Sequence, residues 1–203
     1  DLHKSSHSFP TRRSSDLQGG TSLWLRREQA RLLSRLDFPG HAIGGLSVGE
    51  PKELMWAVLE EIGPLLPADK PRYLMGVGYP EDLVEAVARG VDMFDCVIPT
   101  RNGRKGTVFT NTGRLILKSA RFAEDTAPIQ EDCPCEACRQ YSRAYIRHLI
   151  RSDEILGMRL CTLHNVTFYL RLVRRMREAV VAGTFDQWRR EFLTGYRLEE
   201  GNQ

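Results

Sequence analysis

The stretch Cys133-Pro134-Cys135-Glu136-Ala137-Cys138 places three thiols within six positions, and twenty-five residues separate it from His164. Thiolates and imidazole are ligands that zinc prefers, and a zinc ion held by four protein groups is structural because no position remains for a catalytic water. The alternatives are unpaired core cysteines beside a surface histidine, or a disulfide, which is less consistent with a chain whose other features are typical of the cell interior. We therefore expect one structural Zn2+ that fastens the cysteine loop to a later helix.

The composition is ordinary for a globular protein. The chain has 203 residues, of which 41% are hydrophobic and 27% are charged, and this length is enough to bury one substantial core. No apolar run approaches the roughly eighteen residues that indicate a membrane helix. The N-terminus also lacks the apolar segment of a secretory signal. We therefore expect a cytoplasmic protein without membrane contact.

Positive charge is concentrated in the C-terminal third. Residues 139–190 contain eleven arginines and four acidic residues, although the whole chain carries a formal net charge of only +3. A basic surface of this kind is typical of a protein that binds a polyanion such as RNA. A solvated helical face would explain the same pattern, so charge alone leaves both interpretations open.

Residues 1–17 differ in character from the rest of the chain. They are polar and lack periodicity, and residues 8–17 resemble the conceptual translation of a sequencing adaptor. We expect a non-native segment that takes no part in the fold. The alternative is a native disordered arm that binds RNA through its arginines.

Helical and strand-like patterns alternate from residue 18 to residue 98. The expected helices are 21–37, 51–62 and 80–89, and the expected strands are 41–46, 73–78 and 93–98. Units of this length argue for parallel strands joined by crossover helices. Glycine turns follow two of the strands, at Gly44-Gly45 and Gly76-Val77-Gly78, and in a (β/α) barrel this end of the strands is where chemistry occurs. An open doubly wound sheet remains the structural alternative.

Apolar spacing predicts which side chains enter the core. In the helix 51–62 the expected apolar face consists of Leu54, Met55, Val58, Leu59 and Ile62. Beyond Pro99 the pattern indicates a hairpin over residues 108–117. Helices are then expected at 139–151, at 165–182 and near 185–193. His164 would thus stand at the start of a helix, whose inward residues would be Phe168, Leu172, Val173 and Met176.

Several segments together resemble the tRNA-guanine transglycosylases, the queuine tRNA-ribosyltransferase family. They are Gln18-Gly19-Gly20, residues 44–50 (GGLSVGE), 73–78 (YLMGVG) and 94–104 (FDCVIPTRNGR), and the cysteine cluster with His164. Each segment is weak alone, but the ordered set is specific and runs from about Gln18 to about Tyr196. The resemblance implies an α/β fold in which this chain holds the C-terminal half of an irregular (β/α)8 TIM-type barrel, with a zinc-binding insertion and C-terminal helices.

The same resemblance implies a division of the chain. Residues 18–104 would form the half barrel, residues 105–196 the zinc-binding subdomain with the closing helices, and residues 197–203 a tail. Cys96 and Cys161 stand in apolar surroundings and are expected in the core. His148 lies in an arginine-rich stretch and is expected at the surface.

The implied activity is exchange of the wobble guanine in tRNA anticodons for another base. Asp95 matches the family's nucleophile, a carboxylate that can hold the ribose covalently between two displacements; judged without the family it would be a strand-end cap or a salt-bridge partner. Bacterial members carry valine at the position of Val48, which favours 7-aminomethyl-7-deazaguanine as the incoming base. The other matched positions are Gln18, Gly45, Leu46 and Met75 for the base, and Arg101 and Arg104 for the anticodon loop.

The family's N-terminal half has no counterpart in this sequence. That half supplies a second catalytic aspartate, so we expect the isolated chain to be inactive, and prone to associate through unpaired strand edges. Family members commonly form homodimers through the zinc region, and a homodimer is expected for the full-length protein. The rival interpretations are a non-catalytic, zinc-stabilised tRNA-binding subunit, an RNA-binding module without chemistry, and an unrelated barrel hydrolase that uses Asp95.

Overall fold

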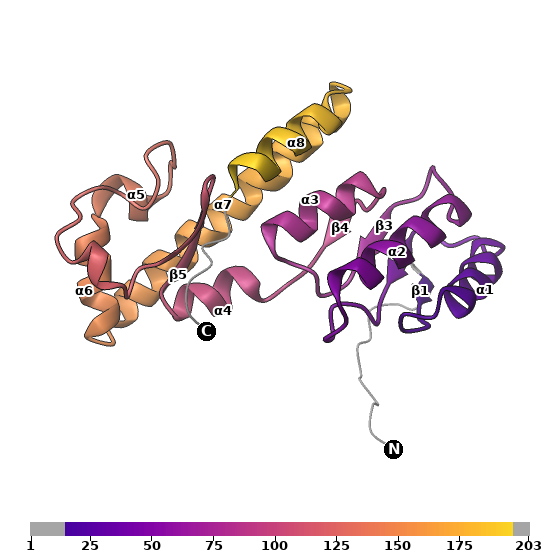
Figure 1. The fold of residues 1–203 in the computed structure, drawn as a ribbon, viewed down its shortest axis with the longest axis horizontal. Helices are drawn as coiled ribbons and strands as arrows, with labels where there is room; N and C mark the ends of the chain where they lie inside the picture. The colour runs from indigo at the N-terminus through magenta and orange to yellow at the C-terminus, as the bar shows by residue number, and fades with distance from the viewer. Residues whose placement is uncertain (1–14, 197–203) are drawn as a thin grey trace, which may run out of the picture. The chain divides into compact units, whose positions relative to one another are not determined.

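The computed structural model describes residues 15–196, and this part of the chain divides into two compact units (Figure 1). The first unit comprises residues 15–77 and 85–96, and the second comprises residues 78–84 and 97–196. Helix α3 (Pro80–Ala88) contributes residues to both. The division falls after Cys96, whereas the sequence predicts one after residue 104, because helix α4 (Ile98–Arg104) packs against a helix of the C-terminal part.

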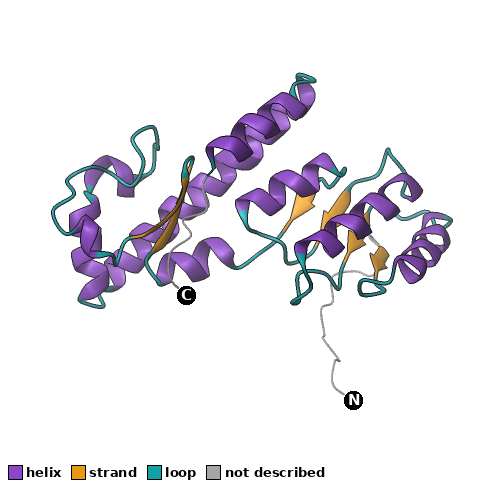
Figure 2. Ribbon diagram, in the orientation of Figure 1, coloured by secondary structure: helices purple, strands orange, loops and turns teal. Residues whose placement is uncertain are grey.

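Parallel strands form the sheet of the first unit, as the alternation of patterns predicts (Figure 2). The described strands follow one another in sequence order across the sheet: β1 (Ser15–Leu17), β2 (His41–Ile43), β3 (Arg72–Leu74) and β4 (Met93–Phe94). The register aligns Leu17, Ile43, Leu74 and Phe94 in one row. The residues that follow these four therefore emerge at the same edge of the sheet.

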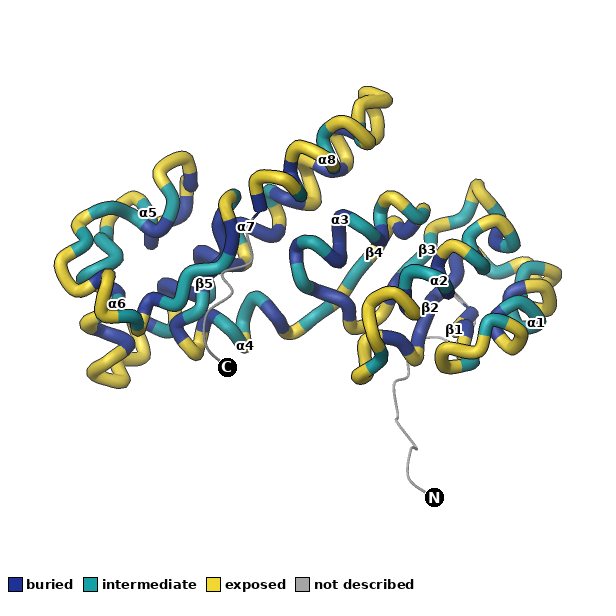
Figure 3. Tube along the Cα trace, in the orientation of Figure 1, coloured by how far each residue is buried: buried dark blue, intermediate teal, exposed yellow. Residues whose placement is uncertain are grey.

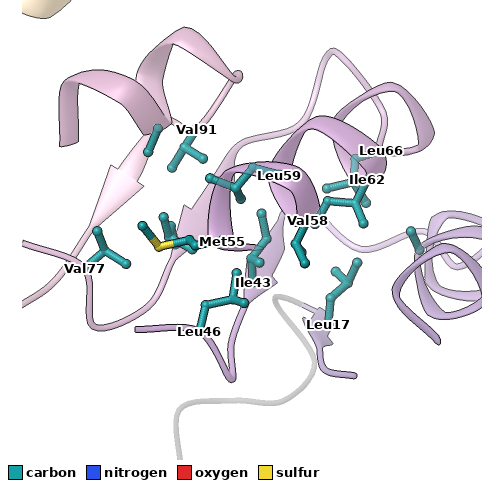
Figure 4. Packing of buried hydrophobic residues seen from close by; sticks show 13 residues of the cluster. Leu17, Ile43, Leu46, Met55, Val58, Leu59, Ile62, Leu66, Val77 and Val91 are labelled. Carbon is teal, nitrogen blue, oxygen red and sulfur yellow. The ribbon is translucent and has the colours of Figure 1, made fainter. Parts of the chain in front are cut away.

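The core of the first unit lies between the strands and the connecting helices α1 (Leu23–Ser34) and α2 (Lys52–Ile62). Figure 4 shows side chains of α2 beside those of the strands, and Leu17 and Val58 are fully buried. Burial of such a side chain contributes roughly 1.5–3 kcal/mol. The expected apolar face of α2 is confirmed except at Leu54, which is 44% exposed.

Two expectations for the first unit are corrected. Ser15–Leu17 form a strand that pairs with β2, so these three residues belong to the fold, while residues 1–14 lie outside the described residues. The expected strand 93–98 ends at Phe94, and α4 begins at Ile98. Pro99 lies in the first turn of α4, where its missing N–H has no intrahelical partner to lose, so it begins a helix instead of only ending a strand.

A hairpin and several helices form the second unit. Strands β5 (Thr107–Thr110) and β6 (Gly113–Ile116) pair in antiparallel fashion, as predicted. Besides α4, the helices of this unit are α5 (Glu136–Gln140), α6 (Arg143–Arg151), α7 (Ile155–Val181) and α8 (Phe185–Gly195). The expected helix 139–151 is therefore two helices, and α6 starts where the hydroxyl of Ser142 accepts a hydrogen bond from the Tyr145 N–H.

Helix α7 packs against α4, α6 and β5, and Figure 3 shows buried and exposed residues alternating along it. It starts at Ile155 instead of residue 165, so His164 lies well inside the helix. Of its expected inward residues, Phe168, Leu172 and Met176 are buried and Val173 is exposed. Within residues 15–196, no helix has both the length and the apolar character needed to cross a membrane.

Candidate metal centre and strand-end site

Cys133, Cys135, Cys138 and His164 converge in the second unit. Their ligand atoms all lie within 4.8 Å of one another. Nδ1 of His164 lies 3.6, 3.7 and 3.2 Å from the three sulfur atoms, taken in chain order. A tetrahedral zinc ion with its usual bond lengths would hold a sulfur and a nitrogen ligand about 3.6 Å apart. The donor set and its spacing therefore fit a four-coordinate metal ion.

The backbone around these four residues presents them to one point. The N–H of Cys138 donates to the carbonyl of Cys135 at 3.1 Å, at the start of α5, so the thiols wrap around one side of the cluster. His164 is fully buried in α7, and its Nε2 lies 2.8 Å from the carbonyl oxygen of Phe109. An N–H donated from Nε2 lets Nδ1 coordinate a metal ion once the proton on Nδ1 is released, which is the usual arrangement of a metal-binding histidine.

The electrostatics of the cluster favour positive charge. Hydrogen bonds from Cys135 and Cys138 lower the pKa of the Cys133 thiol. Burial opposes protonation of His164, but its hydrogen bonds with Cys133 and Cys135 raise its pKa to about 9. A group of sulfurs that stabilises a thiolate and an imidazolium will also stabilise a metal cation, which replaces the protons as it binds.

A second group of side chains gathers at the carboxyl edge of the sheet in the first unit. Asp95 directly follows β4 and is exposed. The Tyr73 hydroxyl donates to its Oδ1 at 2.6 Å, and the Gly76 N–H donates to the same oxygen at 3.0 Å. Burial and the Asp95 carboxylate raise the pKa of Tyr73 to about 12, so the hydroxyl stays a donor at neutral pH. The carboxylate is thus held by Oδ1, and both donors leave Oδ2 available.

Gln18 and Met75 lie beside Gly44 at this edge. A side-chain carbon on Gly44 would collide with the amide nitrogen of Gln18, and would lie 2.7 Å from Asp16 Oδ1 and 3.3 Å from Met75 Sδ. The Gln18 amide donates to both carboxylate oxygens of Asp16 at 3.0 Å. Strands β1 and β3 therefore bring an amide, a carboxylate and a thioether close around the glycine that follows β2, where a larger residue would have to displace the side chains of Gln18 and Asp16.

The loop after β2 carries three further residues expected at the base-binding site. Gly45 has a φ of +66°, a conformation that favours glycine. The side chain of Leu46 is 3% exposed and packs in the core, so only its backbone can reach a ligand. Val48 is 83% exposed, and the N–H groups of Ser47 and Val48 both donate to the carboxylate of Glu50, which fixes the loop.

Arg26 is a site residue that the sequence did not reveal. Its side chain is fully buried in the first unit, and it donates to the carbonyls of Leu17, Gly20 and Gly44 at 2.8–2.9 Å. Burial lowers the pKa of Arg26, and the charges of nearby carboxylates oppose this shift. The guanidinium therefore braces the turn at Gly20, after β1, and the turn at Gly44, after β2. An arginine in an amphipathic helix normally faces water, so the pattern gave no sign of this role.

Tyr73 was also missed, although strand alternation offered a signal. Residues two apart on a strand project from the same face, so Tyr73 shares the face of Met75.

The two residues expected at the anticodon loop, Arg101 and Arg104, belong to the second unit, where they occupy exposed positions of α4. His148 is exposed and Cys161 is buried, as expected, whereas Cys96 is only half-buried.

Comparison with known proteins identifies the family. A family model described as Queuine tRNA-ribosyltransferase matches residues 14–198. A protein of that name from Symbiobacterium thermophilum is 58% identical over 187 residues, which are 92% of this chain and 47% of that protein. One from Pelotomaculum thermopropionicum is 58% identical over 181 residues, 89% of this chain and 49% of its own length. One from Geobacillus kaustophilus is 54% identical over 186 residues, 92% of this chain and 49% of its own length.

The chain thus spans about half the length of the curated relatives that it matches. The match covers both units, including the metal-ligand cluster and the strand-end residues. The chain belongs to the queuine tRNA-ribosyltransferase family.

Proposed function

We propose that this chain is the C-terminal half of a tRNA-guanine transglycosylase, which exchanges the wobble guanine of tRNA anticodons for 7-aminomethyl-7-deazaguanine in queuosine biosynthesis. The observation that carries the proposal is the carboxylate of Asp95. It is exposed directly after a parallel strand, with one oxygen held by Tyr73 and Gly76 and the other available. The name of the relatives, Queuine tRNA-ribosyltransferase, supports the same assignment.

A carboxylate in this position suits the two displacements of base exchange. In the first displacement, an electron pair of Asp95 Oδ2 forms a bond to C1′ of the ribose while the bond from C1′ to guanine N9 breaks. The electron pair of the broken bond leaves with the guanine base, which takes up a proton. In the second, N9 of the incoming base loses a proton and bonds to C1′, and the pair of the ester bond returns to Oδ2. We assign the proton transfers to a carboxylate in the N-terminal half of the enzyme.

The residues around Asp95 suit recognition of a flat heterocycle. The Gln18 amide offers hydrogen bonds to a purine edge, and the thioether of Met75, whose side chain is 38% exposed, can pack on a base. The backbone at Gly45 and Leu46 can approach the ligand closely, and Val48 borders it. On the second unit, the guanidinium groups of Arg101 and Arg104 suit phosphates of the anticodon loop.

For the metal centre we propose a single structural Zn2+ bound by the three thiolates and by Nδ1 of His164. All four positions of a tetrahedron are then taken by protein, so the ion supplies stability and no activated water. Its role is to hold the cysteine loop on α7. We further propose that the full-length protein forms a homodimer through this region.

We also propose that the first unit is a segment of a (β/α)8 barrel. The strand order β1-β2-β3-β4 supports this, because a doubly wound sheet reverses its order at a switch point and this sheet does not. Among the described residues, β1 has no strand on its other side. The N-terminal half of the enzyme would supply that neighbour, and the isolated chain would lack a complete catalytic set.

Incorporation of labelled guanine into tRNA tests the proposal. The full-length enzyme should exchange guanine, Asp95→Ala should lose the activity by a factor of about a thousand or more, and the exposed-carboxylate control Asp69→Ala should match the wild type. The isolated 203-residue chain should show no exchange. Wild-type exchange by Asp95→Ala would instead support a non-catalytic tRNA-binding subunit, for which the arginines of the second unit and the closed metal centre would suffice.

A further inference from the structure

We infer that metal binding in the second unit positions helix α4, and with it Arg101 and Arg104, for contact with RNA, and that Asn165 is the positioning residue. The inference rests on the proposed RNA-binding role of these two arginines. It is carried by a short series of buried contacts that starts at the metal ligand His164 and ends on α4.

The first contacts grip the backbone of Phe109 from two adjacent positions of α7. Nε2 of His164 lies 2.8 Å from the Phe109 carbonyl oxygen, and the Phe109 N–H donates to Oδ1 of Asn165 at 3.1 Å. Both side chains and Phe109 are buried. A change in the orientation of the His164 ring therefore acts on the same residue, Phe109, whose N–H Asn165 holds.

The next contacts connect Asn165 to α4. Its Nδ2 donates to the carbonyl of Pro99, in the first turn of α4, at 2.9 Å, and to the carbonyl of Thr107, in β5, at 3.0 Å. With the bond from Phe109, the side chain uses both of its amide protons and its oxygen. Asn165 is fully buried, so losing these bonds would leave polar groups unsatisfied.

A close approach of two helices completes the link. A side-chain carbon on Gly103 of α4 would lie 2.7 Å from Oγ1 of Thr162 and 2.8 Å from its Cα. Thr162 precedes His164 by two residues on α7. Helix α4 therefore rests directly on the part of α7 that carries the metal ligand. Its buried residues Ile98 and Gly103 face inward, while Arg101 and Arg104 stay exposed.

Without metal, Nδ1 of His164 keeps only its contacts of 3.2–3.7 Å with the three sulfurs, which hold the ring against Phe109 less firmly than coordination to an ion does. The Phe109 backbone that orients the Asn165 side chain is then held less firmly. The hydrogen bonds of Asn165 to Pro99 and Thr107 are weakened as a result, and α4 moves more freely. Two arginines on a mobile helix bind phosphates more weakly than two held at a fixed spacing, because binding must then also order the helix. Metal loss should thus weaken RNA binding through α4.

The test uses the whole 203-residue chain, loaded with zinc, and a fluorescent anticodon stem-loop RNA. We expect Asn165→Ala to retain about one zinc per chain but to bind the RNA at least about tenfold more weakly, near the level of the double variant Arg101→Ala/Arg104→Ala. Hydrogen exchange of α4 amides should be faster than in the wild type. The matched control is Thr167→Ala, which removes only a hydrogen bond within α7, to Leu163, and should match the wild type in both readouts.

The outcomes separate the two claims. Wild-type affinity of the double arginine variant would refute the proposed RNA-binding role itself. A weak double variant combined with wild-type affinity and α4 protection in Asn165→Ala would overturn the inference alone. If Asn165→Ala loses its zinc, Gly103→Ala decides, because Gly103 is not a metal ligand and a methyl group there must push α4 from α7. Gly103→Ala that binds RNA as the wild type does would contradict the inference, and weaker binding with zinc retained would support it.

Discussion

Loss of one metal ligand should unfold the second unit, and Cys138→Ser is the sharpest such change. Its sulfur lies 3.2 Å from Nδ1 of His164, the shortest of the three sulfur distances. A structural zinc site contributes an apparent 10–16 kcal/mol or so in small zinc domains. A whole domain is stable by only about 5–15 kcal/mol. A ligand loss that releases the ion therefore removes a free energy comparable to the entire stability of the unit.

The assay combines metal content with helix content. The wild-type chain should contain about one zinc per molecule, and both Cys138→Ser and chelation should remove zinc together with much of the far-ultraviolet circular dichroism signal from α5–α8. The control is Cys96→Ser, in the first unit and outside the cluster, which should keep its zinc. Cys138→Ser that kept its zinc, or a zinc-free chain with intact helices, would refute the reasoning.

Three other predictions follow from single contacts. In the full-length enzyme, Tyr73→Phe removes a hydrogen bond to a charged acceptor, which is worth about 1.5–3 kcal/mol. Because Asp95 is exposed, we expect the low end of this range, a decrease of about tenfold in kcat with KM unchanged. An unchanged kcat would contradict the proposal that Tyr73 holds the carboxylate. Burial raises the pKa of Asp125, but hydrogen bonds from Ala127 and Arg143 outweigh it, so the pKa is lowered in the folded state. The ionised carboxylate therefore stabilises the fold at pH values above the unfolded pKa. This stabilisation is lost as the pH falls through the folded pKa. Asp125→Asn should therefore lower the free energy of unfolding by at most about 1 kcal/mol at neutral pH. Urea unfolding should show this difference between variant and wild type shrinking below about pH 4. A difference that grew in acid would contradict the assignment. Burial raises the pKa of the Cys161 thiol to about 12, so in the folded, zinc-loaded chain iodoacetamide should label the half-buried Cys96 before Cys161, and early labelling of Cys161 would show that it is accessible.

The sequence was sufficient for the parallel α/β part because its pattern is local. Glycine turns and apolar runs mark each strand and crossover, and the register then brings the residues after each strand to one edge. Boundaries were less predictable. A proline can end a strand, and it also suits the first turn of a helix. Pro99 was therefore compatible both with a strand over residues 93–98 and with a helix that begins at Ile98, as α4 does.

The candidate metal cluster was predictable from residue type, but the position of His164 in its helix was not. The chain leaves α6 and enters α7 through Asp153, whose φ of +53° is unusual for a residue other than glycine. Without a glycine or proline there, no local signal marks where α7 starts. Arg26 and Asn165 illustrate the other limit. Their roles come from buried contacts with distant carbonyls, which depend on the tertiary fold and leave no trace in a periodic pattern.

The most direct test of the central claim is to trap the covalent intermediate. The full-length enzyme is mixed with anticodon stem-loop RNA in the absence of incoming base, denatured, digested and analysed by mass spectrometry. We expect a ribose ester on the peptide that contains Asp95, and we expect it to be absent in Asp95→Asn. An adduct on another residue, or full exchange activity in Asp95→Asn, would contradict the central claim.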